Sequence, residues 1–379
     1  MTTLTTKPLD AALEPIQAKV LGGERLSLDD GRTLLRTRDL FTLGALANVV
    51  RERFHGRQAF YNINRHINYS NLCVLRCKFC SFYRPFRAQG PQAADSYTYT
   101  VEQIVELADE AAQRGATEVH IVGGLHPTLP FSYYTDMCRA IRERCPKLHI
   151  KAFTAIEIVH FTRITRPRLS ISEVLSALRE AGLGSLPGGG AEIFDERVHD
   201  EAFRAKVGEQ QWFDVHHAAH ALGIPSNATM LYGHVESEDE RLAHLIKLRE
   251  QQDVSLAEHP AAFQCFVPLS FIPAGSALSH LPGPTGLDDL RTLAISRLML
   301  DNVPHIKAFW IMQSPQLAQV SLNWGVDDFD GTVVWYDITK REGRGTTSQE
   351  LSVAQIERLM REAGCEPVER DTLYRRVDR

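Results

Sequence analysis

Three cysteines stand close together in the stretch NYSNLCVLRCKFCSFYR, which runs from Asn68 to Arg84. They are Cys73, Cys77 and Cys80, with three and then two residues between them. Zinc sites usually take four ligands in paired motifs, and the sequence has no second pair of this kind. Three thiolates can instead hold a [4Fe–4S] cube and leave its fourth iron open for a substrate. The spacing therefore predicts an iron–sulfur cluster with one open coordination site.

Two other interpretations of this motif stay open at this point. The thiols could be core residues without a metal, although Arg76 and Lys78 interrupt any apolar face. They could also bind zinc with a ligand from elsewhere, such as His66 or His126. Four further cysteines fall in predicted helices, in a predicted strand or after a helix stop, and we expect them to be structural: Cys138, Cys145, Cys265 and Cys365.

Glycines and polar residues lie in or directly after several predicted strands, and a β/α barrel places its chemistry where its strands end. Gly123 and Gly124 follow the strand predicted at 117–122, where they form a plain turn or let a ligand approach the backbone. Glu192 is expected in a strand near 191–194, where its carboxylate accepts hydrogen bonds from a ribose or forms a structural ion pair.

The strand predicted at 148–155 and the residues at its end carry further polar groups. Lys151, Thr154 and Glu157 need partners if they are buried. A ligand hydroxyl and a salt bridge inside the barrel are the two alternatives. Asp327 and Asp328, much later in the chain, are interpreted as solvated turn residues.

The elements that must position these residues alternate between β-rich and amphipathic helical runs. This alternation predicts a parallel sheet, and eight units predict a closed (β/α)8 TIM-type barrel, with an open doubly wound sheet as the alternative. Strands are expected near 60–68, 117–122, 148–155, 191–194, 227–232, 263–269, 305–312 and 332–336. Helices are expected near 101–114, 131–145, 170–182, 209–222, 287–301 and 315–322, with one more starting at Ser237. We expect a helical leader over 1–55, the barrel over 56–340, and an extension over 341–379 that packs on the barrel.

Composition narrows the class of protein. The 379 residues carry 42 basic and 47 acidic side chains, a net charge of −5. This balance argues against nucleic-acid binding, which relies on clustered Lys and Arg. We expect no membrane span, because no apolar run approaches about 18 residues. The first residues lack the features of a secretory or transit signal, so a cytoplasmic location is expected.

Taken together, the motifs resemble those of the aminofutalosine synthases, a family within the radical S-adenosylmethionine (SAM) superfamily. The resemblance rests on NRHINYSNLCVLRCKFCSFYR, HIVGGLHPTLPFSYY, HIKAFTAIEI, LPGGGAEIF and NWGVDDFDGT, in this order. It implies that the open iron chelates the amino and carboxylate groups of SAM and that Phe79 packs near the adenine. It also implies that Gly123 and Gly124 hold the SAM amino group through backbone carbonyls. Leu125 replaces the acid that often follows, so only this backbone part carries over.

The resemblance also implies a reaction in menaquinone biosynthesis. SAM, a consumed substrate, is joined to 3-[(1-carboxyvinyl)oxy]benzoate to give 6-amino-6-deoxyfutalosine, methionine and bicarbonate. An external donor such as flavodoxin or ferredoxin would reduce the cluster. The two substrate carboxylates need cations, and the candidates at strand ends are Arg65, His66, Arg84, His126 and Lys151, with Thr154 and Glu157 as further polar groups.

Three alternatives remain at this stage. A cyclic dehypoxanthinyl futalosine synthase or an F0-synthase-like enzyme would use the same cluster and SAM. A noncatalytic iron–sulfur electron carrier is more remote, because it has no need of an open iron.

Overall fold

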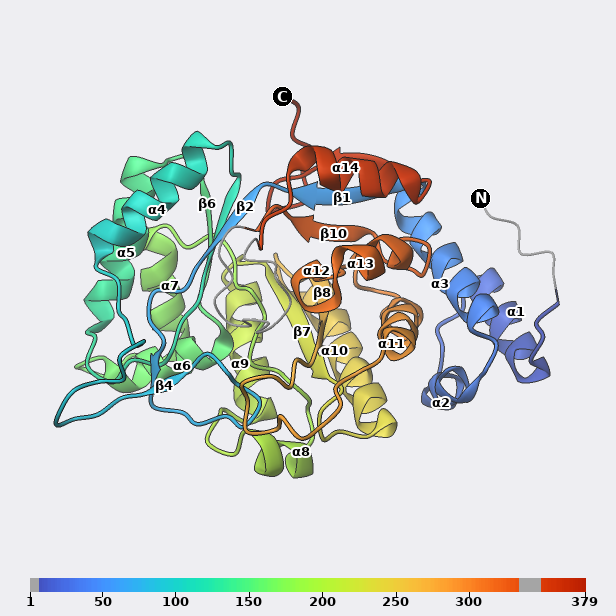
Figure 1. The fold of residues 1–379 in the computed structure, drawn as a ribbon, viewed down its shortest axis with the longest axis horizontal. Coiled ribbons are helices and arrows are strands. Elements are labelled where there is room, and N and C mark those ends of the chain that lie inside the picture. Colours follow the sequence, from blue (N-terminus) through green and yellow to red (C-terminus); the bar gives the residue numbers. More distant parts are fainter. Residues whose placement is uncertain (1–6, 334–348) are drawn as a thin grey trace.

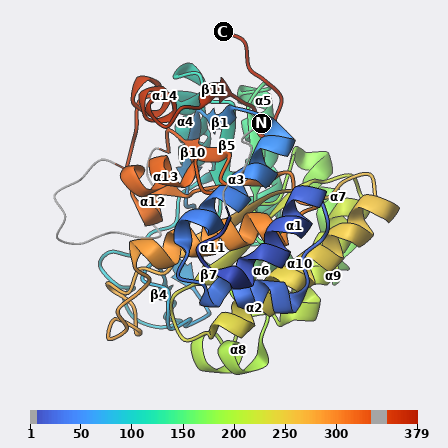
Figure 2. The same cartoon turned by 90° about the vertical axis from the view of Figure 1, so that its right-hand side faces the viewer.

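The computed structural model describes residues 7–333 and 349–379. Its first part is helical and consists of a short 3-10 helix, Ala11–Leu13, followed by α1 (Glu14–Gly22), α2 (Leu28–Arg36) and α3 (Leu40–His55). Figure 2 shows these helices in front of α10 (Glu238–Glu258) and α11 (Gly286–Met299), and α2 and α3 pack on that pair. The helical leader therefore covers one side of the domain that follows.

Eight parallel strands close into a barrel. β1 (Gln58–Asn62) pairs with β10 (Asp328–Gly331), and its continuation β2 (Asn64–Ile67) pairs with β5 (Glu118–Ile121), so one bent strand joins the two edges of the ring. Between those edges lie β6 (His149–Ala152), a short bridge strand at 185–186, β7 (Ser226–Tyr232), β8 (Phe263–Ser270) and β9 (His305–Ile306). The predicted TIM-type barrel is confirmed, and the open-sheet alternative is wrong.

Helices form an outer layer around these strands, as Figure 1 shows. Capping boxes start several of them, because a Ser or Thr side chain and a Glu or Gln three residues later satisfy backbone N–H groups that have no partner in the helix. Thr100, Ser170 and Ser237 play this part. The outer helices that follow the early and middle strands are α4 (Val101–Gln113), α5 (Phe131–Arg144), α7 (Ile171–Ala181) and α9 (Glu209–Ala221).

Several predicted strands differ from the observed ones in position or extent, among them the one predicted at 305–312, of which only His305–Ile306 form a strand and residues 310–313 are helical. β6 ends at Ala152, and the next residues form α6 (Ala155–Ile164), because Thr154 and Glu157 make a capping box. Glu157 therefore lies in a helix and not behind a strand. The fourth strand is the bridge at 185–186, and residues 191–194 are irregular, since the glycines before them adopt left-handed backbone at Gly188 and Gly190.

The last predicted strand begins earlier than expected, at Asp328, and the predicted residues 334–336 lie outside the described ones. Asp327 and Asp328 are not solvated turn residues: both are fully buried. Asp328 accepts hydrogen bonds from Arg370 Nε (2.9 Å) and Nη2 (2.6 Å) and from Tyr374 Oη (2.5 Å). Buried carboxylates need such cations and donors.

The two ends of the barrel carry different segments (Figure 1). β3 (Leu72–Cys73), β4 (Arg84–Pro85) and α8 (Glu196–Ala202) follow the carboxyl ends of strands. α12 (Trp310–Gln313) and α13 (Pro315–Ser321) lie between β9 and β10. After the undescribed residues, α14 (Val353–Glu362) leads to β11 (Glu366–Glu369), which pairs with β1. Of the helices described, none is both long and apolar enough to cross a membrane.

Candidate functional site

The cysteine loop follows β2 at the carboxyl end of the strands, where barrel enzymes carry their chemistry. Cys73 and Cys80 are partly exposed, and Cys77 is buried. Backbone N–H groups of Leu75 and Leu125 lie 3.3 and 3.4 Å from Cys73 Sγ. N–H groups of Phe82 and Tyr83 also point at the Cys80 thiol. Donors of this kind stabilise thiolates that bind iron–sulfur clusters.

The donor set suits a cluster better than a zinc ion. Within the described residues, only His55, His305 and Asp327 bring three candidate ligand atoms within 4.8 Å of one another. The three sulfur atoms of the loop are therefore spread more widely than tetrahedral zinc requires, since Zn–S bonds of about 2.3 Å place sulfurs about 3.8 Å apart. A cube binds each thiolate at a different iron, so it accepts the wider spacing. Burial raises the pKa of all three thiols, that of Cys77 to about 12, so metal binding must displace their protons.

A cavity of about 240 Å³, which we call the outer cavity, opens beside this loop. Its lining includes every residue that the sequence singled out for the cluster and for SAM: Cys73, Cys77, Cys80, Phe79, Gly123, Gly124 and Glu192. These residues come from three separate stretches of the chain, and the barrel brings them together. Much of the remaining lining is apolar, which suits a site that excludes water from a reactive intermediate.

Gly123 and Gly124 pack too closely against Tyr69 and Leu72 to carry a side chain. A Cβ atom at Gly124 would lie 2.3 Å from Leu72 O, and one at Gly123 would lie 2.7 Å from the ring of Tyr69. Both positions therefore exclude any larger residue. Glu157 fixes this turn from α6: its Oε1 accepts from Gly123 N (3.2 Å) and Tyr69 Oη (2.8 Å). Leu125 stands where related proteins often have an acid after the two glycines. Here Glu157, from α6, supplies a carboxylate to the same turn instead.

Glu192 meets a partner that the sequence did not indicate. It contacts Lys206 Nζ in an ion pair, and both side chains are about nine-tenths buried. Glu192 has a left-handed backbone with φ 46°, outside any strand, which corrects the prediction of a strand position. Lys206 Nζ also lies 4.9 Å from the centre of the Phe79 ring. Lys206 follows α8 in a loop without periodicity, so no pattern in the sequence could have placed it here.

The other predicted site residues divide into two groups. Lys151, Thr154 and His66 line a second cavity inside the barrel, and Thr154 and Glu157 line the outer cavity. The remaining three line neither cavity: Arg65, Arg84 and His126.

Each of these three has partners elsewhere. Arg65 turns outward and pairs with Glu110 of α4 at 2.7 Å. Arg84 pairs with Asp95 and donates to the carbonyls of residues 81–83 at 3.0–3.2 Å, so it braces the end of the cysteine loop. His126 Nδ1 accepts from the N–H groups of Thr128 and Leu129.

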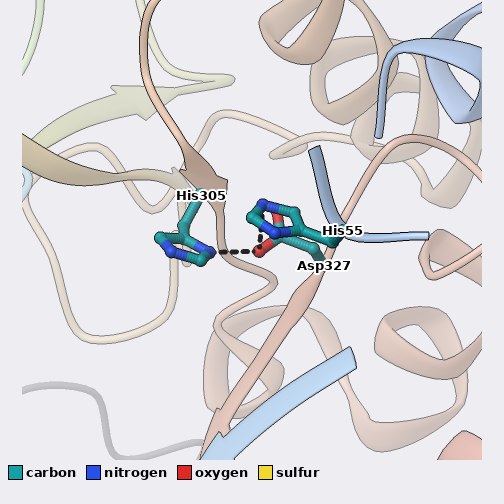
Figure 3. Close-up of side chains that lie close together, drawn as sticks. All are labelled: His55, His305 and Asp327. Atoms are coloured by element: carbon teal, nitrogen blue, oxygen red, sulfur yellow. Dashed lines mark hydrogen bonds and ion pairs between the residues drawn. The ribbon is translucent and has the colours of Figure 1, made fainter. Parts of the chain in front are cut away.

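A separate group of ionisable side chains lies at the opposite end of the barrel, and we call it the floor cluster: His55, Arg297, His305 and Asp327. Figure 3 shows three of them, His55, His305 and Asp327. Asp327 Oδ2 lies 2.6 Å from His305 Nδ1, and Asp327 Oδ1 accepts from Arg297 Nη2 at 2.6 Å. His55 Nε2 lies 2.7 Å from Pro304 O, so this nitrogen carries a proton and cannot bind a metal. The floor cluster is therefore a hydrogen-bonded ion network and not a metal centre.

Comparisons with known proteins agree with this geometry. Residues 67–248 match the radical SAM superfamily model, and residues 260–379 match a model described as the CofH/MqnC C-terminal region. The aminodeoxyfutalosine synthase of Thermus thermophilus is 47% identical over 97% of this chain and 96% of its own length. That of Streptomyces coelicolor is 41% identical over 97% and 94%, and a cyclic dehypoxanthine futalosine synthase of Halalkalibacterium halodurans is 33% identical over 96% and 94%.

Solved structures show the same fold at lower identity. Methylornithine synthase, PylB, superposes with a TM-score of 0.71 at 18% identity, covering 93% of this chain and 97% of its own. HydG from Carboxydothermus hydrogenoformans gives 0.71 at 18% identity, covering 96% and 81%. Members of the radical SAM superfamily use a [4Fe–4S] cluster and SAM. With the cysteine loop, the barrel and its near full-length relatives in view, this chain belongs to the radical SAM superfamily and, within it, to the aminodeoxyfutalosine synthase family.

Proposed function

We propose that this chain catalyses the aminodeoxyfutalosine synthase reaction, in which the adenosyl group of SAM is joined to 3-[(1-carboxyvinyl)oxy]benzoate. One observation carries the proposal. The cysteine loop, the glycine pair and Glu192 line a single cavity, in a chain that is 47% identical over nearly its full length to a synthase of this name. The products are 6-amino-6-deoxyfutalosine, methionine and bicarbonate, and the route is menaquinone biosynthesis.

Cys73, Cys77 and Cys80 are the proposed cluster ligands. Their sulfurs lie on one loop and face the outer cavity, and Cys73 and Cys80 receive backbone N–H groups. When bound, the cluster supplies the electron that cleaves SAM to methionine and a 5′-deoxyadenosyl radical. The protein adds Lys206, whose positive charge partly offsets the rise that burial causes in the pKa of the Cys77 and Cys80 thiols, and so favours the thiolates that iron needs.

The same cavity provides the proposed contacts to SAM. Phe79 offers a ring face to the adenine, and the backbone at Gly123 and Gly124 offers carbonyls to the amino group. Glu192 accepts hydrogen bonds from the ribose hydroxyls, and its carboxylate also pairs with Lys206. Bonds to a charged acceptor of this kind contribute about 1.5–3 kcal/mol each.

In the proposed reaction, the 5′-deoxyadenosyl radical adds to the vinyl carbon of the second substrate. The adduct radical then rearranges on the aromatic ring, and its carboxyl group leaves together with the unpaired electron. That electron would return to the oxidised cluster, and the CO2 left behind takes up water to give bicarbonate. The walls of the outer cavity hold radical and alkene within reach of each other, which favours addition over escape. The adenosyl atoms therefore remain in the product.

We also propose that an external donor of the flavodoxin or ferredoxin class supplies the electron, and that the enzyme works in the cytoplasm. Arg76 and Lys78, on either side of Cys77, are exposed and basic, which suits an acidic donor surface. All seven cysteines are free thiols, as a reducing compartment maintains them.

The decisive experiment is anaerobic incubation of the reconstituted enzyme with reductant, SAM labelled in its adenine and the enolpyruvyl benzoate. We expect label in a larger aromatic nucleoside, release of bicarbonate, and free 5′-deoxyadenosine only as a minor product. Label that appears solely in 5′-deoxyadenosine, together with consumption of a futalosine-type nucleoside offered instead, would contradict the proposal and support the cyclic dehypoxanthine futalosine synthase reaction.

A further inference from the structure

A second cavity, which we call the inner cavity, lies inside the barrel below the outer one. It has a volume of about 140 Å³. The two cavities share four lining residues, so they are direct neighbours: Val122, Thr154, Gly189 and Leu269. The outer cavity is the proposed site of SAM, and the inner cavity is free for the second substrate.

The strand register places the inner cavity about 7 Å below the outer one. Inward-facing residues on a strand are two positions apart, which is a rise of about 7 Å. On β5, Val122 follows the strand end and lines both cavities, and His120 lines only the inner one. On β8 the corresponding residues are Leu269 and Val267. A molecule with its reactive carbon in the outer cavity would therefore extend its far end into the inner cavity. We call the charged and imidazole side chains that line the inner cavity the belt: His66, Glu118, His120, Lys151, Lys307 and Asp330.

The belt is polar, which is unusual for the interior of a barrel. Large branched apolar side chains fill most barrels of this type. Here His66, His120 and Lys151 are direct register partners across β2, β5 and β6, and all three line the cavity. Lys307, directly after β9, and Asp330 of β10 line the same cavity.

Two buried ion pairs hold the charges of this belt. Lys151 Nζ lies 2.7 Å from Glu118 Oε2, and Lys307 Nζ lies 2.6 Å from Asp330 Oδ1. Replacing a buried ion pair with apolar groups is often neutral or stabilising, so stability alone does not account for two of them beside a cavity. A ligand that uses their remaining hydrogen-bonding capacity does account for them.

The lining also selects the kind of ligand. Each lysine ammonium has three N–H groups, and within the described residues one of them is used, on the paired carboxylate. Asn227 adds an amide, while Val122, Val267, Leu269 and Phe309 supply apolar surface. The charges of the two lysines and two acids cancel, so one added negative charge is tolerated more easily than a phosphate dianion. The lining therefore favours a flat apolar group that ends in a single carboxylate.

We propose that the inner cavity holds the benzoate end of the substrate, with the ring between the apolar side chains and its carboxylate bound by Lys307 and Asn227. This assignment rests on the proposed function and adds the orientation of the substrate: the ring carboxylate points down the barrel, and the vinyl group faces the outer cavity. Lys307 is then a specificity-determining residue.

The test compares two substrates in reconstituted holoenzyme. One is 3-[(1-carboxyvinyl)oxy]benzoate, and the other is the analogue without the ring carboxylate, 2-phenoxyacrylate. The wild type should prefer the first by at least tenfold in kcat/KM. Lys307→Met should lose most of this preference by raising KM for the benzoate, and it should release more free 5′-deoxyadenosine. Iron content and the Kd for SAM should stay within twofold of wild type.

Two further variants keep the test decisive. Asn227→Ala removes a donor without leaving a buried charge, and it should reduce the same preference by a few fold even if Lys307→Met folds poorly. Lys19→Met breaks a lysine ion pair in the helical leader, at 2.8 Å from Asp30, and should leave the preference unchanged. If Lys307→Met and Asn227→Ala slow both substrates equally, the orientation is wrong. If the wild type forms no adduct from either substrate, the proposed function itself fails, and the orientation fails with it.

Discussion

The two ends of the barrel both bury several charged side chains, but they surround them differently. In the floor cluster Asp327 is fully buried, and each of its oxygens accepts a hydrogen bond from a neighbouring cation or imidazole. At the inner cavity, Asp330 Oδ2 is buried without a hydrogen-bond partner, and the lysines border open space. Acidic and basic side chains therefore satisfy one another in the floor cluster, whereas at the inner cavity they keep hydrogen-bonding capacity for a ligand.

This difference assigns separate roles to the two ends. The floor cluster joins α3, α11, β9 and β10, so its contacts hold together segments that are far apart in sequence. The cysteine loop lines the outer cavity, and the outer and inner cavities share lining residues, so this end of the barrel leaves room for ligands. Changes at the floor should lower stability, and changes at the cavities should alter chemistry or binding.

The largest expected effect is at the cysteine loop. Cys77→Ala leaves two thiolates, which cannot hold a cube, so we expect loss of the broad brown absorbance and of SAM cleavage. Cys138→Ala, a buried thiol in α5, is the matched control and should keep both. Iron analysis and 5′-deoxyadenosine assays measure the outcome, and full iron content in Cys77→Ala would contradict the ligand assignment.

Asp327→Asn, in the floor cluster, should lower stability without changing the chemistry at the other end of the barrel. The change leaves the buried guanidinium of Arg297 without its counter-charge, and breaking a buried pair in this way costs about 3–5 kcal/mol of unfolding free energy. Urea unfolding measures this loss. Iron content and SAM cleavage per folded molecule should match the wild type, and a selective loss of SAM cleavage would show that the two ends are coupled.

Glu192→Gln tests the proposed ribose contact. We expect SAM binding to weaken about tenfold, because a neutral amide replaces a charged acceptor, with unchanged iron content. Lys206 also loses its partner in this variant, so Glu209→Gln, which takes the partner from Lys247 outside the outer cavity, is the control. Equal SAM affinity in Glu192→Gln and wild type would leave Glu192 with only its structural ion pair.

The smallest expected effect is a pH dependence at the floor. The pKa of Asp327 lies well below its usual value because His305, Arg297 and His55 stabilise the carboxylate. A depressed pKa contributes stability above the unfolded value of about 3.9, and this contribution is lost as the pH falls through the folded value. The stability gap between wild type and Asp327→Asn should therefore narrow by about 1 kcal/mol between pH 7 and pH 3. A gap that widens in acid would contradict the assignment.

Much of the catalytic end could be predicted from the sequence, because its signals are local. The cysteine spacing and the glycine pair each stand within a few residues, and the alternation of strands and helices gave the barrel. Thr154 and Glu157 form a capping box at the start of α6, and in the sequence this pair of polar residues cannot be told from polar residues of a strand. Asp327 and Asp328 resemble turn residues until the distant cations Arg297 and Arg370 are known.

The pairing of Lys206 with Glu192 could not be predicted for a related reason. The two residues meet through an irregular segment and a loop, and neither has a periodicity that fixes the direction of its side chain. Contacts between distant segments depend on the complete tertiary structure, and no pattern of spacing in one sequence encodes them.

The pairing of β11 with β1 has a consequence for biosynthesis. β1 forms from residues 58–62, but its outer neighbour is 366–369, and Arg370 alone brings a guanidinium to the buried carboxylate of Asp328. A nascent chain therefore lacks the guanidinium partner of this buried carboxylate until residue 370 can reach the barrel. Folding of this domain is completed late in translation, and a stalled chain that stops before Arg370 should be digested by protease faster than the full-length protein.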